Sequence, residues 1–198
     1  MDIVIIKYNA GNIRSVDFAL QRMGIKAEIT NNFDKIRKAD RVIFPGVGEA
    51  STTMKYLKEN KLDILIKDLK QPVLGICLGL QLMCKHSEEG DTDCIGIFDT
   101  NVKLFTSDTS DIKYKVPHMG WSNLYNLKSK LFDDSIDNQY VYFVHSYYAE
   151  INGETAAQCN YIFPFSAALH CKNFYATQFH PEKSGPVGER ILKNFIEL

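Results

Sequence analysis

The sequence has 198 residues, of which 45% are hydrophobic and 24% are charged, and its formal net charge is −1. This length predicts one domain with a large core, spanning residues 1–198. The near-zero charge gives no electrostatic basis for binding nucleic acid or an anionic membrane, and no apolar run approaches the roughly 20 residues that cross a bilayer. The first residues read as a strand rather than a signal peptide, and five irregularly spaced cysteines indicate a reducing, cytoplasmic location.

Strands and helices are predicted to alternate over the first 86 residues. The β-branched run at 3–6 predicts a buried strand. Apolar residues from Ile13 to Met23 recur at helical spacing, with Asn12 as the N-cap and Gly24 as the stop. Further strands are expected at 26–30, 41–44 and 72–77, and helices at 33–38, 50–60, 62–69 and 78–86. This alternation predicts an α/β fold with a doubly wound, mostly parallel central sheet flanked by helices.

The second half is predicted to be mainly strands. They are expected at 100–105, 120–127, 140–148, 155–160, 166–171 and 174–178, with a hairpin turn at Lys172-Asn173. Only the final stretch, from Val187 to Ile196, has a clear helical pattern. The C-terminal half is therefore expected to add an antiparallel β extension to the parallel sheet.

A cysteine flanked by glycines occupies a predicted strand-to-helix corner, in Gly75-Ile-Cys77-Leu-Gly79. This pattern is typical of a nucleophile elbow, where a sharp and crowded turn leaves no room for neighbouring side chains. The start of the following helix favours the reactive thiolate form of a cysteine. The alternative interpretation is a small buried cysteine that packs in a strand.

A base for this cysteine is expected at His180, which follows a predicted strand. Residues i and i+2 of an extended segment point the same way, so Glu182 can lie behind the imidazole and fix its tautomer. The alternative is a solvated surface turn. The elbow cysteine a hundred residues upstream favours a Cys-His-Glu triad.

Acyl transfer also requires donors for an oxyanion. The N–H of Leu78 is one candidate, and the turn Gly46-Val47-Gly48 can present a second. Gln81 lies one helical turn after Cys77, where it can bind a polar substrate or be a solvated residue. Cys84, His86 and Cys94 lack the paired spacing of a zinc site, so no metal is expected.

Together, Gly75-Ile-Cys77-Leu-Gly79-x-Gln81 and His180-Pro-Glu182 resemble the class I glutamine amidotransferases, which hydrolyse glutamine and deliver ammonia to a synthase site. Four further stretches are similar to one branch, the glutaminase subunits of imidazole glycerol phosphate synthase of histidine biosynthesis. These stretches are 8–15, Pro45–Gly48, Pro117–Trp121 and Tyr142–Tyr147. The resemblance covers essentially the whole chain and implies a flavodoxin-like fold and no cofactor.

The resemblance also implies residue roles. Cys77 would form the glutamyl thioester, His180 would act as base and then acid, and Glu182 would orient it; Leu78 with a flipped Val47-Gly48 peptide would form the oxyanion hole. Positions that hold glutamine are matched by Gly46, Gln81, His145, Ser146 and Tyr147. Positions that face the partner, a (β/α)8-barrel cyclase subunit joined as a heterodimer, are matched by Asn12, Trp121, Tyr142 and Lys183. Glutaminase activity in this family stays low until the cyclase binds its nucleotide substrate.

Other functions remain open at this point. A paralogous glutaminase subunit could supply ammonia to another synthase, such as one that amidates a surface sugar. A regulatory subunit without catalysis, or a cysteine hydrolase acting on peptides or folate conjugates, are further alternatives. The complete set of Cys77, His180, Glu182 and Gln81 argues against the regulatory subunit.

Overall fold

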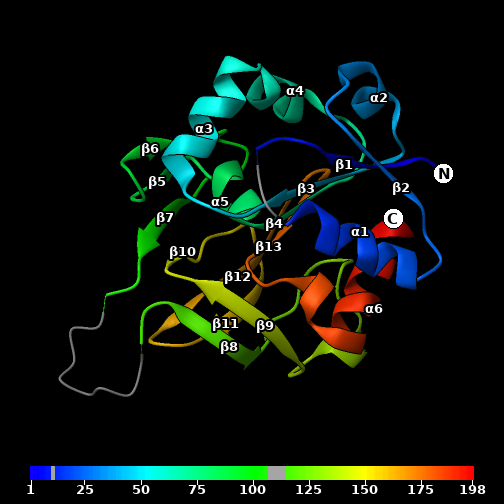
Figure 1. Ribbon diagram of the computed structural model, residues 1–198. Helices are drawn as coiled ribbons and strands as arrows, with labels where there is room; N and C mark the ends of the chain where they lie inside the picture. Colours follow the sequence, from blue (N-terminus) through cyan, green and yellow to red (C-terminus); the bar gives the residue numbers. More distant parts are fainter. Residues whose placement is uncertain (10–11, 107–114) are drawn as a thin grey trace.

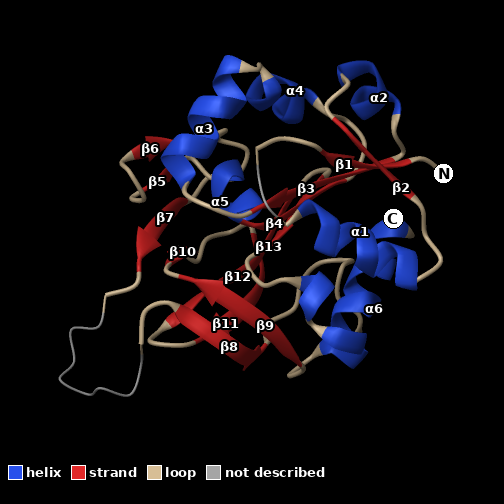
Figure 2. Ribbon diagram, viewed as in Figure 1, coloured by secondary structure: helices blue, strands red, loops and turns tan. Residues whose placement is uncertain are grey.

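The computed structural model describes residues 1–9, 12–106 and 115–198. Among them, eleven strands form one mixed sheet (Figures 1 and 2). Its parallel part has, in spatial order, β2 (Ala27–Thr30), β1 (Ile3–Ile6), β3 (Arg41–Gly46), β4 (Val73–Cys77) and β13 (Phe174–Thr177). Because β13 lies directly beside β4, the predicted elbow strand and the strand before His180 are neighbours in the sheet.

The second part of the sheet is mostly antiparallel. It continues from β13 through β12 (Pro164–Cys171), β10 (Tyr147–Ala149), β7 (Asn101–Leu104), β5 (His86–Ser87) and β6 (Thr92–Asp93), while β11 (Thr155–Asn160) also pairs with β12. A separate hairpin of β8 (His118–Asn123) and β9 (Tyr140–His145) lies over this part. The predicted fold class is confirmed.

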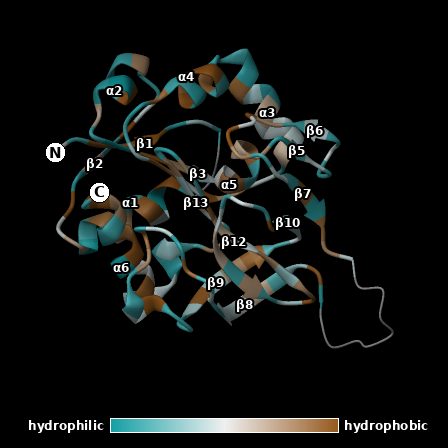
Figure 3. Ribbon diagram, turned by 180° about the vertical axis from the view of Figure 1, so that it is seen from behind, coloured by the Kyte–Doolittle hydropathy of each residue, from teal (hydrophilic) through white to brown (hydrophobic). Residues whose placement is uncertain are grey.

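Helices cover both faces of the parallel strands (Figure 1). One face carries α2 (Phe33–Lys38), α3 (Ala50–Glu59), α4 (Leu62–Asp68) and α5 (Leu78–Met83); the other carries α1 (Ile13–Arg22) and α6 (Gly185–Ile196). Side chains of β1 alternate between the two cores, since Val4 and Ile6 pack under α2–α4 while Ile3 and Ile5 pack under α1 and α6. In Figure 3, α1 and α4 each carry hydrophobic and hydrophilic colours, as expected for helices with one buried face.

A third core fills the C-terminal half. Phe143 of β9, Phe165 of β12 and Phe179, which follows β13, are fully buried there and meet edge to face. This cluster fixes the β8–β9 hairpin against the main sheet next to the residues that follow β13. It therefore positions one wall of the site described below.

The predicted strand at 140–148 is wrong in one respect, because the chain changes sheets at Ser146. β9 pairs with β8 up to His145, and β10 then pairs with β7 and β12. Aromatic and apolar residues stand on both sides of Ser146, so the sequence does not reveal this change. The predicted helix 78–86 ends at Met83, since β5 begins at His86. The two-residue strands and the 3-10 helices η1 (Asp134–Ile136) and η2 (Pro181–Lys183) are too short to give a periodic signal.

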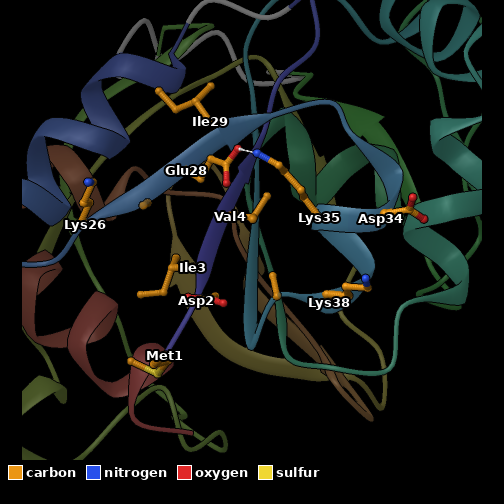
Figure 4. A pocket seen from close by; sticks show the side chains of 12 residues that line it. Met1, Asp2, Ile3, Val4, Lys26, Glu28, Ile29, Asp34, Lys35 and Lys38 are labelled. Atoms are coloured by element: carbon orange, nitrogen blue, oxygen red, sulfur yellow. Dashed lines mark hydrogen bonds and ion pairs between the residues drawn. The ribbon is translucent and has the colours of Figure 1, made fainter.

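A shallow hollow of about 820 Å³ lies at the amino ends of β1 and β2 (Figure 4). Its polar side chains include Glu28 and Lys35, which form an ion pair with each other. Of the residues that the structure describes, no cysteine or histidine lines this hollow. Ligands of such sheets bind beyond the carboxyl ends of the strands, so the candidate site is at the opposite end.

Candidate active site

Cys77 sits at a strained corner between β4 and α5. Its φ of 55° and ψ of −112° place a non-glycine residue in a region that side chains rarely adopt. A Cβ on Gly79 would lie 2.2 Å from the carbonyl oxygen of Phe44, and one on Gly46 would lie 2.4 Å from the nitrogen of Gly79. The glycines around Cys77 are therefore required by backbone contacts between β3 and the elbow, as the sequence pattern predicts.

His180 and Glu182 form a buried pair beside this corner. His180 Nδ1 donates to Glu182 Oε1 at 2.7 Å, and both side chains are almost fully excluded from solvent. Burial alone would lower the pKa of His180, but hydrogen bonds to Cys77 and Glu182 outweigh it and raise this pKa to about 10. The arrangement favours an imidazolium next to the Cys77 sulfur.

Asn12 contacts this pair. It occupies the N-cap position of α1 as predicted, but its side chain makes no capping bond and instead donates to Glu182 Oε1. The amide thus adds a hydrogen bond to the carboxylate that holds His180. It is half-buried, between the pair and the surface.

The backbone of His180 is tied to the β8–β9 hairpin. His180 N–H donates to the carbonyl oxygen of Tyr142 at 2.9 Å. The buried Ser184 hydroxyl donates to the carbonyl oxygen of His180 at 2.6 Å and accepts from Tyr142 N–H at 3.0 Å. These bonds fix the backbone of His180 relative to β9.

A cavity of about 370 Å³ opens at the carboxyl ends of β3 and β4. It brings together both Cys77 and His180 with most of the residues that the sequence singles out. The lining comprises Val47, Gly48, Cys77, Leu78, Gln81, Glu89, Pro117, Val144, His145, Ser146, Tyr147, His180 and Lys183. Gly46, predicted in the same group, is buried behind this lining, and Glu182 lies behind His180.

Gln81 is held by two buried hydrogen bonds. Its Nε2 donates to the carbonyl oxygen of Tyr147 at 3.0 Å and to Oε1 of Gln178 at 3.0 Å. Both amide hydrogens are engaged, so the carbonyl oxygen is the group that Gln81 can offer to a ligand. Gln178 is fully buried, and its own Nε2 faces the Cys77 sulfur at 3.9 Å.

His145 is buried and belongs to a directed chain of hydrogen bonds. Its Nδ1 must donate to the carbonyl oxygen of Tyr147, at 2.7 Å, so Nε2 accepts from His118 Nδ1 at 3.1 Å. His118 Nε2 then accepts from the hydroxyl of Ser122 at 2.9 Å. Burial lowers the pKa of His118 to about 4 and that of His145 to about 3, so both rings are neutral. Through the bond from His145, this chain of hydrogen bonds fixes the backbone of Tyr147 in the cavity wall.

The segment after β3 forms the opposite wall. Tyr8 donates its hydroxyl to the carbonyl oxygen of Pro45 at 2.5 Å, and burial, with the nearby Cys77, raises the pKa of Tyr8 so that it stays a donor. Gly48 has a φ of +108°, in the region that favours glycine. Val47 and Gly48 therefore reach the cavity from a strand end that Tyr8 anchors.

Of the four residues predicted to face a partner, Lys183 lines the cavity, Trp121 and Tyr142 lie on the β8–β9 hairpin, and Asn12 contacts Glu182. Trp121 of β8 is 55% exposed, and its ring lies 6.0 Å from that of Tyr142 on β9. Lys183 lines the cavity and is exposed. The Met119 side chain, also exposed, lies on the same face of β8 as Trp121.

Sequence reasoning missed four residues of this site. Gln178 and Ser184 read as ordinary polar residues near strand and turn ends. His118 could not be ranked among the histidines, and Glu89 lies in a loop without a pattern. Glu89 is the one acidic residue that lines the cavity among the described residues, and its Oε2 accepts from Ala50 N–H at 2.8 Å.

Among the described residues, no group of three or more acidic, histidine or cysteine side chains could hold a metal ion. The described helices include none long and apolar enough to cross a membrane. All five cysteines are free.

Comparisons with known proteins show which family the chain resembles. Residues 4–198 match the family described as "Glutamine amidotransferase class-I". The chain is 62% identical over 198 residues to "Imidazole glycerol phosphate synthase subunit HisH" of Bacteroides fragilis, and 44% identical over 200 residues to the subunit of the same name from Escherichia coli K12; in both cases 100% of each chain is covered.

Two solved structures have a similar fold at low sequence identity. A putative GMP synthase protein from Thermoplasma acidophilum gives a TM-score of 0.73 at 20% identity, covering 100% of this chain and 93% of that one. PurLQS from Thermotoga maritima gives 0.69 at 14% identity, covering 99% of this chain and 97% of that one. The chain thus belongs to the class-I glutamine amidotransferase family, within the group of HisH subunits of imidazole glycerol phosphate synthase.

Proposed function

We propose that this chain, acting as one catalytic domain over residues 1–198, hydrolyses the side-chain amide of L-glutamine to glutamate and ammonia. The observation that carries the proposal is the hydrogen-bonded pair of His180 and Glu182, with His180 and Cys77 lining one cavity. The family match and the HisH relatives agree with this chemistry.

The Cys77 thiolate attacks the amide carbon of glutamine. The N–H of Leu78 and the Val47-Gly48 peptide receive the charge that develops on the oxygen. The imidazolium of His180 gives its proton to the leaving nitrogen, so ammonia departs and a thioester remains. His180 then takes a proton from water, the resulting hydroxide attacks the thioester, and glutamate leaves. Glu182 keeps the histidine in the required tautomer, and Asn12 supports that carboxylate.

Glutamine recognition follows from the polar groups of the cavity. The carbonyl oxygen of Gln81 and the Glu89 carboxylate are acceptors suited to the α-ammonium group. Burial raises the pKa of Glu89, and a bound ammonium would favour its charged form. Backbone groups at His145–Tyr147, which line the cavity, would hold the remaining amino-acid end. The cavity size, about 370 Å³, suits an amino acid.

We also propose that the ammonia passes to a cyclase subunit that makes imidazole glycerol phosphate and AICAR in L-histidine biosynthesis. The similarity to HisH subunits of imidazole glycerol phosphate synthase favours this pathway over a paralogous synthase. Trp121, Tyr142, Lys183 and Asn12 are assigned to the shared surface. The exposed Trp121 and Met119 support a docking face there. Five free cysteines support a cytoplasmic location.

The test is glutamate release from glutamine by the chain alone, with a histidine-pathway cyclase subunit, and with the cyclase and its nucleotide substrate. We expect little release alone and strong release in the full mixture. The Cys77→Ala variant should bind the cyclase and release no glutamate. Glutamate release that is the same with and without the cyclase would support the hydrolase chemistry and refute the proposed pathway. Glutamate release by Cys77→Ala would refute the assignment of Cys77 as the nucleophile.

A further inference from the structure

We propose that Gln178 is a fourth member of the catalytic machinery: its amide N–H donates to the Cys77 sulfur while its carbonyl oxygen fixes the orientation of Gln81. The inference rests on the proposed role of Cys77 as the nucleophile. It concerns a residue that lies two positions before the base and has no role in the mechanism above.

The geometry assigns each end of the Gln178 amide. The Tyr147 carbonyl oxygen can only accept, which makes the Gln81 atom that contacts it the nitrogen Nε2. The same Nε2 then donates to Gln178, whose contacting atom must be Oε1. Gln178 Nε2 is left facing Cys77 Sγ at 3.9 Å. A wrong assignment of one amide would leave two like groups facing each other, so the orientation follows from the backbone carbonyl.

Burial makes this arrangement consequential. Gln178 is 0% exposed and Gln81 4% exposed. A buried amide N–H that donates to a sulfur stabilises the thiolate more than the neutral thiol, because hydrogen bonds to charged groups are stronger. One side chain thereby connects the reacting sulfur to the residue that receives the substrate.

Strand pairing explains why Gln178 occupies this place. β13 pairs with β4 in register up to Thr177 beside Ile76, so the next residue of each strand, Gln178 and Cys77, come side by side. Gln178 N–H also donates to the carbonyl oxygen of Ala167 at 2.8 Å, which fixes its backbone to β12. The backbone at Gln178 is therefore positioned by both β12 and β4.

The experiment is the pH dependence of Cys77 alkylation by iodoacetamide, measured on the full chain by mass spectrometry of the labelled peptide. Labelling should be selective, because burial raises the pKa of the thiols of Cys84, Cys94, Cys159 and Cys171. The Gln178→Met variant keeps the volume and removes both polar ends. We expect the pH midpoint of alkylation to rise by about one unit, because the thiolate loses a hydrogen-bond donor.

The matched control is Thr177→Val, which removes a buried hydroxyl that bonds to the carbonyl oxygen of Phe179, away from the sulfur. It should leave the alkylation profile unchanged. A second variant, Gln178→Glu, places a carboxyl group, a stronger acid than a thiol, beside the sulfur. Its ionisation should raise the pH midpoint at least as far as Gln178→Met does.

Glutamine kinetics in the complex with the cyclase supply a second readout. Gln178→Met should raise KM, because the Gln81 amide loses an anchor, and should also lower kcat. An unchanged pH midpoint of alkylation in Gln178→Met, or an equal change in Thr177→Val, would overturn the proposal. Alkylation requires no turnover, so a chain that fails to hydrolyse glutamine would refute the proposed function while this result still decides the role of Gln178.

Discussion

Gly188 of α6 sits against the short helix that carries Glu182, and this contact leads to a sharp prediction for Gly188→Ala. An added Cβ would lie 1.9 Å from the carbonyl oxygen of Pro181. An ordinary van der Waals contact needs about 3.4 Å, so α6 and η2 must separate by roughly 1.5 Å. The obstacle is a backbone atom, which no side-chain rotation removes.

The displacement falls on the carbonyl group of Pro181, the residue between His180 and Glu182. Overpacking of this kind costs about 1–3 kcal/mol, and the higher helix propensity of alanine returns about 1 kcal/mol of that. We expect the melting temperature to fall by only a few degrees. A shift of about 1 Å at a catalytic group can cost about a hundredfold in rate, so kcat for glutamine should fall much further than stability.

The assays are glutamate release in the presence of cyclase and nucleotide substrate, and thermal unfolding of the isolated chain. Gly153→Ala is the matched control, because a Cβ there meets nothing within 4 Å. Unchanged kcat in Gly188→Ala, with the control also unchanged, would refute the argument that α6 fixes the position of the triad. A large loss of stability with normal kcat would refute it as well.

Three further predictions concern the triad, the buried histidines and the cavity mouth. Glu182→Gln should lower kcat more than it raises KM, because orientation of His180 matters most in the transition state; a large KM increase at unchanged kcat would contradict this. The free energy of unfolding should fall as the pH drops from about 6.5 towards 4, because the unfolded chain protonates His118 at its ordinary pKa and the folded chain only near 4. Urea titrations at pH 7 and pH 5 measure this, and His118→Phe should reduce the difference; an identical difference in the variant would exclude His118 as the cause. Lys183→Ala should weaken cyclase binding or stimulation and leave the melting temperature unchanged, and equal affinity and stimulation would make Lys183 an ordinary surface charge.

The sequence predicts the parts of the site that depend on local patterns. The glycines around Cys77 are visible because a crowded corner excludes side chains, and the structure places backbone atoms 2.2 Å from a Cβ added at Gly79. Strands that end at Gly46, Cys77 and Thr177 converge because parallel neighbours share one carboxyl edge. Those regularities suffice to predict that Cys77 and His180 meet.

The residues and contacts that sequence reasoning missed depend on register and on tertiary contacts. Gln178 faces the sulfur only because β13 pairs with β4 one residue before it. Asn12 has the pattern of a helix cap, and a tertiary partner, Glu182, takes its amide instead. His118 and Ser122 belong to a hydrogen-bonded chain because β8 turns its even-numbered residues inward. The local sequence carries no signal for any of these contacts.

The central position of β13 has a consequence for the synthesis of the chain. β4 is made a hundred residues before β13, yet Val73 pairs with Phe174. Until that late strand inserts, β4 is an open edge of the sheet, with unpaired backbone groups that can associate with another chain. A growing chain that has reached residue 170 already carries the proposed nucleophile but lacks the base, its carboxylate and Gln178. The chain therefore has no complete triad for amide hydrolysis until β13 has paired with β4.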